Sequence, residues 1–151
     1  MEHLIEKYQL SPHPEGGYYR EVYRSAQTVN SPITGEKRHA VTQIYFLLTA
    51  GQISRFHRVV HDEIWHFYEG APLTLIQYDG KKVGEQTIGP DSGYMAVVPG
   101  GVWQAAESTG EYTLVGCTVA PGFDFADFSF LEGQPQAEQL KKDYPQYQKF
   151  I

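Results

Sequence analysis

The sequence has one cysteine, few basic residues and no long apolar run. A single thiol, Cys117, cannot close an intramolecular disulfide. Twelve Lys and Arg residues against eighteen Asp and Glu residues give a formal net charge of −6, which argues against binding to a nucleic-acid backbone. No stretch approaches the roughly 20 apolar residues that cross a bilayer, and the N-terminal MEHLIEKYQL lacks the features of a signal peptide. The simplest interpretation is a soluble, cytoplasmic protein without a membrane partner.

Aromatic and β-branched residues are abundant. Aromatic residues make up 14% of the chain, with eleven Tyr and eight Phe. Such residues favour strands over helices. At 151 residues the chain is long enough to bury a sizeable core and too short for two ordinary domains. We therefore expect residues 1–151 to form a single, mainly β domain.

Short strand patterns separated by turn formers run through the chain. The predicted strands are residues 18–25, 40–50, 73–78, 81–88, 94–98, 102–106 and 112–119. Between the third and fourth, Asp79 and Gly80 suit the positive backbone angles of a tight hairpin turn. Short strands at this spacing are typical of a jelly-roll sandwich.

Two helices and one loop complete the expected organisation. Residues 2–9 show a short helical pattern that must end before Pro12, and we expect this helix to cap the barrel. Residues 135–144 predict a second helix, which Pro145 should stop. Residues 25–38 are rich in turn formers, which predicts a mobile loop and leaves open a role as a lid.

Two glycine-bounded segments carry the most informative spacing. In the first, Gly51, five residues and His57 are followed by Val59, Glu63 and a closing Gly70. This frame resembles the first conserved motif of the cupin superfamily. In that motif the position of Val59 belongs to a second metal-binding histidine, and a valine side chain has no donor atom for a metal.

The second segment places Gly93, Pro99 and Gly101 in a frame that ends at Gln104, and it resembles the second cupin motif. There, Gln104 occupies the position of another metal-binding histidine. Only His57 and Glu63 remain of four ligand positions, whereas a catalytic first-row metal usually needs three protein ligands and an open position. The resemblance thus implies a cupin double-stranded β-helix, or jelly-roll barrel, with no cofactor and no standard metal site.

The chain from His13 through Phe123 also resembles a small branch of cupins of unknown function. The segments that carry this resemblance are HPEGGYYREVYRS, FHRVVHDEIWHFYEG and VPGGVWQAAE. The branch is similar in architecture to the sugar-nucleotide 3,5-epimerases of rhamnose synthesis, which are metal-free cupins. The resemblance therefore makes a metal-free reaction a natural hypothesis.

Those epimerases begin with a strand that the present sequence matches in part, at Glu15, Gly17, Tyr19, Glu21 and Tyr23. Their catalytic base is a histidine, a role that the resemblance gives to His57. Their catalytic acid is a tyrosine, for which Tyr45 and Tyr94 are candidates. The aspartate that supports the histidine in the epimerases has no matching motif here.

Strand alternation predicts which side chains face the barrel interior. If Glu63 points inward, Trp65 and Phe67 do too, and His66 and Tyr68 point outward. The same alternation places His57 inside, and the second motif places Gln104 across the barrel from it. A carboxylate beside an imidazole stabilises its protonated form, so His57 would exchange protons near neutral pH.

We therefore expect a homodimeric cupin that binds a small polar or carbohydrate-like molecule. The leading hypothesis is a metal-independent epimerase or isomerase with His57 as the base and Glu63 as its orienter. The expected ligand contacts are Arg55, Trp65, Gln104, Tyr45 and Tyr94, with Arg55 or Gln104 as the stabiliser of an oxyanion.

Three alternatives remain open. One is a metal-dependent, oxygenase-like cupin in which Gln104 or His61 joins His57 and Glu63 around a divalent metal. Another is a small-molecule-binding protein without turnover. In the third, His57 and Glu63 only satisfy one another inside a polar core.

Overall fold

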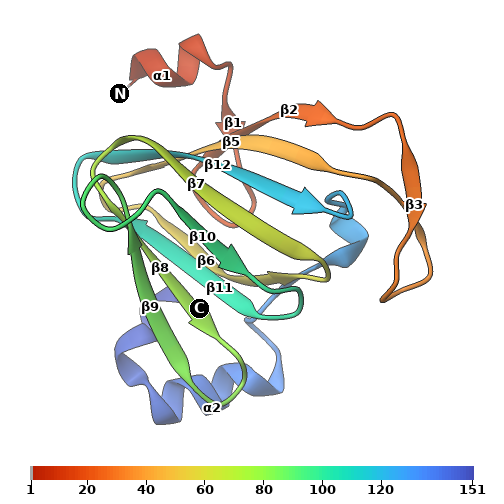
Figure 1. Ribbon diagram of the computed structural model, residues 1–151. Coiled ribbons are helices and arrows are strands. Elements are labelled where there is room, and N and C mark those ends of the chain that lie inside the picture. The colour runs from red at the N-terminus through yellow and green to blue at the C-terminus, as the bar shows by residue number, and fades with distance from the viewer. Residues whose placement is uncertain (1) are drawn as a thin grey trace.

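Two antiparallel sheets packed face to face make up most of the computed structural model, which describes residues 2–151 (Figure 1). The six-stranded sheet has the order β1 (Ser11–Pro12), β2 (Tyr18–Arg24), β5 (Thr42–Thr49), β12 (Tyr112–Ala120), β7 (Asp62–Gly70) and β10 (Met95–Val98). The five-stranded sheet has the order β13 (Phe128–Phe130), β6 (Ile53–Val59), β11 (Trp103–Ser108), β8 (Leu73–Tyr78) and β9 (Val83–Ile88). The prediction of a mainly β fold is confirmed.

The main core lies between the two sheets. Its buried members come from both, and they include Phe46, Trp65, Val115 and Cys117 from the six-stranded sheet and Leu75, Ile88 and Ala106 from the five-stranded sheet. Alternation along β7 is as predicted. Trp65 is buried and Phe67 packs against the core, whereas Tyr68 is exposed and His66 bonds to Thr118 on the neighbouring strand.

Helices pack against parts of the outer faces of both sheets. Against the five-stranded sheet pack α2 (Pro135–Asp143) and the 3-10 helix η2 (Pro145–Phe150), through residues such as Leu140 and Phe150. The predicted end of α2 before Pro145 is confirmed. The N-terminal helix α1 (Glu2–Lys7) was expected to cap the barrel, but Leu4 packs with Leu47 and Leu114 on the outside of the six-stranded sheet.

A third, two-stranded sheet projects from the body as a hairpin (Figure 1). It consists of β3 (Thr28–Asn30) and β4 (Lys37–His39) and lies where a mobile loop was expected, at residues 25–38. The turn formers there occupy the bend between the strands, where the Ser31 hydroxyl accepts the backbone N–H groups of Ile33 and Thr34. A loop is therefore present at residues 31–36 as expected, but residues 28–30 and 37–39 form strands that the sequence analysis missed.

The β8–β9 hairpin has the predicted turn. Gly80 has a φ of +98°, and the Asp79 carboxylate accepts the backbone N–H groups of Lys81 and Lys82. The other predicted strands are also present, with ends that differ by at most two residues. Across residues 2–151, every helix is too short or too polar to span a bilayer.

Candidate functional site

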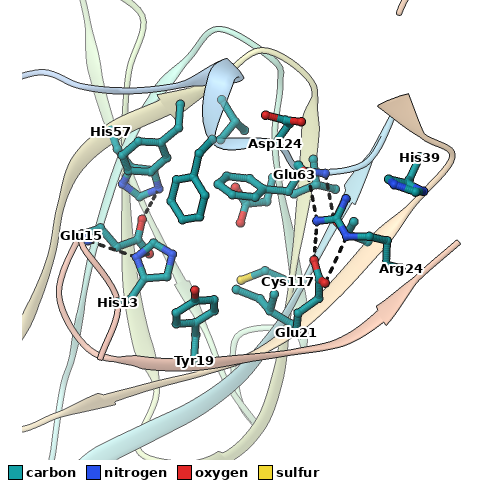
Figure 2. Close-up of a pocket in the computed structure, with 17 residues that line it drawn as sticks. His13, Glu15, Tyr19, Glu21, Arg24, His39, His57, Glu63, Cys117 and Asp124 are labelled. Carbon is teal, nitrogen blue, oxygen red and sulfur yellow. Dashed lines mark hydrogen bonds and ion pairs between the residues drawn. The ribbon is translucent and has the colours of Figure 1, made fainter. Parts of the chain in front are cut away.

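A cavity of about 580 Å³ opens between the sheets at one end of the barrel (Figure 2). Its walls come from β2, β5, β7 and β12 on one side and from β6 and β13 on the other. Glu15, His57 and Glu63 lie buried in its lining, whereas Asp124 and Phe125 are exposed and mark its mouth. This volume is within the usual range for a small-molecule site.

His57 and Glu15 form a buried ion pair on one wall of the cavity (Figure 2). The His57 Nε2 atom lies 2.6 Å from the Glu15 Oε2 atom, and Nδ1 lies 2.7 Å from the carbonyl oxygen of Arg55. Since both partners are acceptors, both ring nitrogens carry protons. Burial lowers the pKa of His57, but the charge and hydrogen bond of Glu15 outweigh it, and the pKa is raised.

The same ion pair lowers the pKa of Glu15. Burial raises the pKa of its carboxyl group, but the charge and hydrogen bond of His57 hold that pKa below its usual value. Glu15 is therefore a buried carboxylate. The orienting carboxylate expected beside His57 was Glu63, and the one in contact with the ring is Glu15.

Glycine allows Glu15 to reach this position from the loop between β1 and β2. Gly16 has a φ of +113°, and a Cβ atom there would lie 2.0 Å from the carbonyl oxygen of Ile53. The close approach of this loop to β6 is completed by the Arg55 backbone N–H, which donates to the Glu15 carbonyl over 2.8 Å. The glycine pair in HPEGG was the available sequence signal for this site.

His13 lies beside the ion pair as a neutral ring. Its Nδ1 atom accepts the backbone N–H of Glu15 at 3.1 Å, so the ring proton is on Nε2. Burial lowers the pKa of His13, which the charge of Glu15 only partly offsets. The ring meets Tyr19 edge to face at 4.5 Å, and both residues line the cavity.

Glu63 is held by a chain of hydrogen bonds that runs behind the cavity. The Trp65 Nε1–H donates to Gln104 Oε1 at 2.8 Å, which turns Gln104 Nε2 toward Glu63 Oε1 at 2.9 Å. Because the indole is only a donor, this fixes the orientation of the amide. Burial, with a contribution from the Glu15 charge, raises the pKa of Glu63 to about 7. Burial also raises the pKa of the neighbouring Cys117 thiol, which stays protonated.

A β-bulge in β2 brings Arg24 into the cavity wall. The register with β5 shifts between Glu21 and Tyr23, so that Arg24 lines the cavity and Tyr23 is exposed. Arg24 makes a two-pronged ion pair with Glu21, with distances of 2.5 and 3.1 Å. Its Nη2 atom also donates to the carbonyl oxygen of Phe123 at 3.1 Å.

The residues considered as metal ligands do not fit a divalent ion. Both nitrogens of His57 are hydrogen-bonded, and Gln104 is held by Trp65 and Glu63. His61 bonds instead to the Ser31 hydroxyl, away from the cavity lining. Over residues 2–151, no three His, Cys, Asp or Glu side chains gather in a way that could hold a metal ion.

Several ligand contacts expected from the sequence lie outside the cavity lining. Arg55 stacks on Phe130 at 4.3 Å, and its side chain is outside the cavity. Tyr45 packs against α1 on the outer face of the sheet, and Tyr94 is 61% exposed. Trp65 and Gln104 are buried outside the cavity lining, where Trp65 bonds to Gln104 and Gln104 bonds to Glu63.

The structure brings His57 and Glu63 to the same cavity, as expected, and adds side chains that the sequence did not assign to it. These are His13, Arg24, His39, Asp124 and a group of phenylalanines from the chain segment after β12. For Glu15, Tyr19 and Glu21, the partial match to the epimerase strand was a usable signal. For the others, no local pattern in the sequence indicated a site.

Comparison with known proteins gives relatives over almost the full chain. The family model described as Cupin superfamily (DUF985) matches residues 2–131. An uncharacterized protein from Saccharomyces cerevisiae is 33% identical over 159 residues, which cover 93% of this chain and 79% of that protein. Neither the family description nor this relative carries an assigned activity.

Two solved structures are similar in both sequence and fold. A hypothetical protein from Leishmania major is 35% identical with a TM-score of 0.86, covering 99% of this chain and 95% of that one. A protein from Shewanella oneidensis is 33% identical with a TM-score of 0.83, covering 98% of this chain and 92% of that one. The resemblance first indicated by the glycine-bounded motifs is confirmed. The chain belongs to the cupin superfamily, in the branch described as DUF985.

Proposed function

We propose that this cupin binds a small polar, carbohydrate-like molecule in its cavity and moves a proton next to a carbonyl group, as an epimerase or isomerase does. The observation that supports this most is the contrast between two buried carboxyl groups. The pKa of Glu15 is held low, whereas that of Glu63 is raised to about 7. Two carboxyls with opposite shifts at one site are typical of a base and an acid.

The proposed step uses these two groups in complementary roles. The Glu15 carboxylate takes a proton from the carbon next to the carbonyl, and the electron pair of that C–H bond moves toward the carbonyl oxygen. That oxygen takes the proton of the Glu63 carboxyl group, which gives a neutral enol. When the neighbouring carbon carries a hydroxyl group, this enol is an enediol. Glu15 then returns its proton to the former carbonyl carbon, and the hydroxyl of the neighbouring carbon gives its proton to Glu63, which completes the isomerisation without an oxidant.

The remaining residues have supporting roles in this proposal. His57 keeps Glu15 ionised and oriented. The base is therefore Glu15 rather than the His57 imidazole expected from the sequence, because both ring nitrogens of His57 already carry protons. Trp65 and Gln104 act as positioning residues, because they hold Glu63 through the hydrogen bonds described above. Gln104, which replaces a metal ligand of other cupins, orients an acid here.

Deuterium exchange tests this proposal directly. Small sugars and keto acids are screened by thermal shift, and compounds that stabilise the protein are incubated with it in D2O and followed by proton NMR. The wild type should introduce deuterium next to the carbonyl. Glu15→Gln and Glu63→Gln should each slow this exchange by roughly 10²- to 10⁴-fold, the contribution of a positioned acid or base.

Glu111→Gln is the matched control, because Glu111 is an exposed glutamate outside the cavity lining and its substitution should leave exchange unchanged. A stabilising ligand that never gains deuterium would contradict the proposed reaction. That result would instead favour a binding protein without turnover.

A further inference from the structure

The charged groups that line the cavity are mostly acidic. They comprise four carboxyl groups, one guanidinium group and one imidazolium group, namely Glu15, Glu21, Glu63, Asp124, Arg24 and His57. Two contacts pair off part of this set: Glu15 binds His57 at 2.6 Å, and Arg24 binds Glu21 at 2.5 Å. Of the other two carboxyl groups, Glu63 keeps its proton up to about pH 7, which leaves Asp124 as the carboxylate of the lining outside these ion pairs.

The other two histidines in the lining are each hydrogen-bonded to the backbone through Nδ1. His13 accepts a backbone N–H at Nδ1 and is neutral. His39 Nδ1 lies 2.7 Å from the carbonyl oxygen of Ser25 and donates to it. The donors of Arg24 are directed at Glu21 and at the carbonyl of Phe123. A phosphate or carboxylate entering the cavity would meet the His57 and Arg24 cations already paired with Glu15 and Glu21.

Aromatic rings form the wall next to Asp124. Phe123 and Phe125 meet edge to face with centroids 4.8 Å apart, and Phe128 lies 5.9 Å from Phe125 and 6.1 Å from Phe123. All three rings line the cavity. The faces of aromatic rings attract cations, and quaternary and methylated ammonium groups are recognised in proteins by such clusters.

We infer that the cavity takes a ligand with a positively charged nitrogen, such as a protonated amino sugar or a quaternary amine. The cation would lie against the Phe123 and Phe125 rings, with the Asp124 carboxylate at the mouth as its counter-charge. This deepens the proposed function, on which it rests for the choice of site, by naming the charge class of the ligand.

Isothermal titration with matched pairs of compounds tests the charge directly. Choline is compared with its neutral isostere 3,3-dimethylbutan-1-ol, and glucosamine is compared with glucose and with glucose 6-phosphate. Each ammonium compound should bind at least about 10-fold more tightly than its neutral partner, the scale of a desolvated cation over aromatic rings. Equal binding of a neutral partner, tighter binding of the phosphate, or no binding of either ammonium compound would overturn the inference.

Two variants locate the cation without disturbing the fold. Asp124→Asn removes the charge while an amide oxygen can still accept the Ala126 backbone N–H, and Phe125→Leu removes one ring at the exposed mouth. Each should weaken ammonium binding about threefold to tenfold and leave the neutral partners unchanged. Asp91→Asn, an exposed control outside the cavity lining, should change neither. Cation binding without deuterium exchange would keep this inference and refute only the proposed reaction.

Discussion

At the scale of single residues, the two buried glutamates of the cavity, Glu15 and Glu63, have pKa shifts of opposite sign. Glu15 gains a cationic partner in the folded state, so its carboxylate stabilises the protein above its usual pKa of 4.5 and loses this effect as pH falls. His57 has a raised pKa, so it stabilises below its usual pKa of 6.5 and loses this effect as pH rises through its folded pKa. The pair therefore stabilises the fold most between pH 4.5 and 6.5.

The raised pKa of Glu63 makes the folded state less stable as pH rises. Its pKa rises from 4.5 to about 7 on folding, so the folded state keeps a proton that the unfolded state releases. Stability should therefore fall as pH increases from 4.5 to about 7, by as much as about 3 kcal/mol. Glu63→Gln should abolish this fall and make the variant more stable than the wild type above pH 7.

Urea unfolding at a series of pH values measures this effect, with Glu111→Gln as the exposed control that keeps the wild-type profile. A Glu63→Gln profile that runs parallel to the wild type would show that Glu63 ionises at its ordinary pH.

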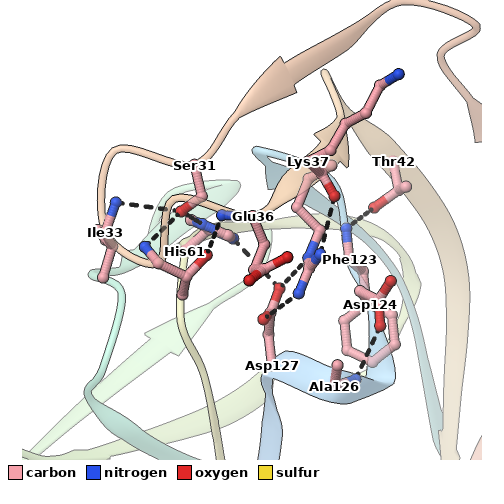
Figure 3. Close-up of polar contacts among 12 residues, drawn as sticks. Ser31, Ile33, Glu36, Lys37, Thr42, His61, Phe123, Asp124, Ala126 and Asp127 are labelled. Carbon is pink, nitrogen blue, oxygen red and sulfur yellow. Dashed lines mark hydrogen bonds and ion pairs between the residues drawn. The ribbon is translucent and has the colours of Figure 1, made fainter.

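At the scale of elements, the β3–β4 hairpin is fastened to the body by polar side chains (Figure 3). Arg38 makes two hydrogen bonds to the Asp127 carboxylate, at 2.8 and 2.9 Å, from β4 to the 3-10 helix η1 (Phe125–Asp127). The Ser31 hydroxyl, which accepts two backbone N–H groups, lies 2.6 Å from His61 Nε2 and donates its proton there. Because η1 carries part of the cavity mouth, the hairpin and the mouth are coupled.

Arg38→Gln should make both the β3–β4 hairpin and the segment around η1 more mobile. We expect backbone amides of residues 28–39 and 124–128 to exchange with deuterium roughly 10-fold faster, since a charge-assisted contact between two surface segments is lost. Lys37→Gln, at the exposed position beside it on β4, is the control and should exchange at the wild-type rate. Unchanged exchange in Arg38→Gln, measured by mass spectrometry, would show that the ion pair does not hold the hairpin.

At the scale of the whole molecule, part of the outer face of the six-stranded sheet has no cover within the chain that the structure describes. On the outside of β7 and the edge strand β10, the side chains of Tyr68, Met95 and Val97 are 45 to 48% exposed. The opposite sheet is covered by α2 and η2, and α1 packs on Leu47 and Leu114 elsewhere on the six-stranded sheet. Clustered apolar side chains of this kind mark contact surfaces.

The homodimer expected from the sequence should use this face. Val97→Lys should shift the protein toward the monomer in sedimentation velocity, because it places a charge in the contact. Val29→Lys alters another exposed valine, on β3, and should leave the assembly unchanged. A wild-type protein that sediments as a 17.1 kDa monomer at micromolar concentration would refute the dimer.

The sequence by itself determined the fold and placed two residues of the site, His57 and Glu63, in the barrel interior. Glycine and proline positions around His57 and Glu63, together with strand alternation, were local patterns, and they correctly indicated a cupin barrel with both side chains facing inward. The replacement of metal ligands by Val59 and Gln104 was equally visible. These features depend on residues close together in the chain, which is why spacing alone reveals them.

Only the tertiary structure decided which groups meet. Glu15 reaches His57 because Gly16 lets a distant loop approach β6, and the bulge in β2 turns Arg24 rather than Tyr23 into the cavity. No local pattern reports contacts between segments so far apart in the chain. The pKa of Glu63 likewise depends on burial and on the charge of Glu15, which exist only once the sheets have packed.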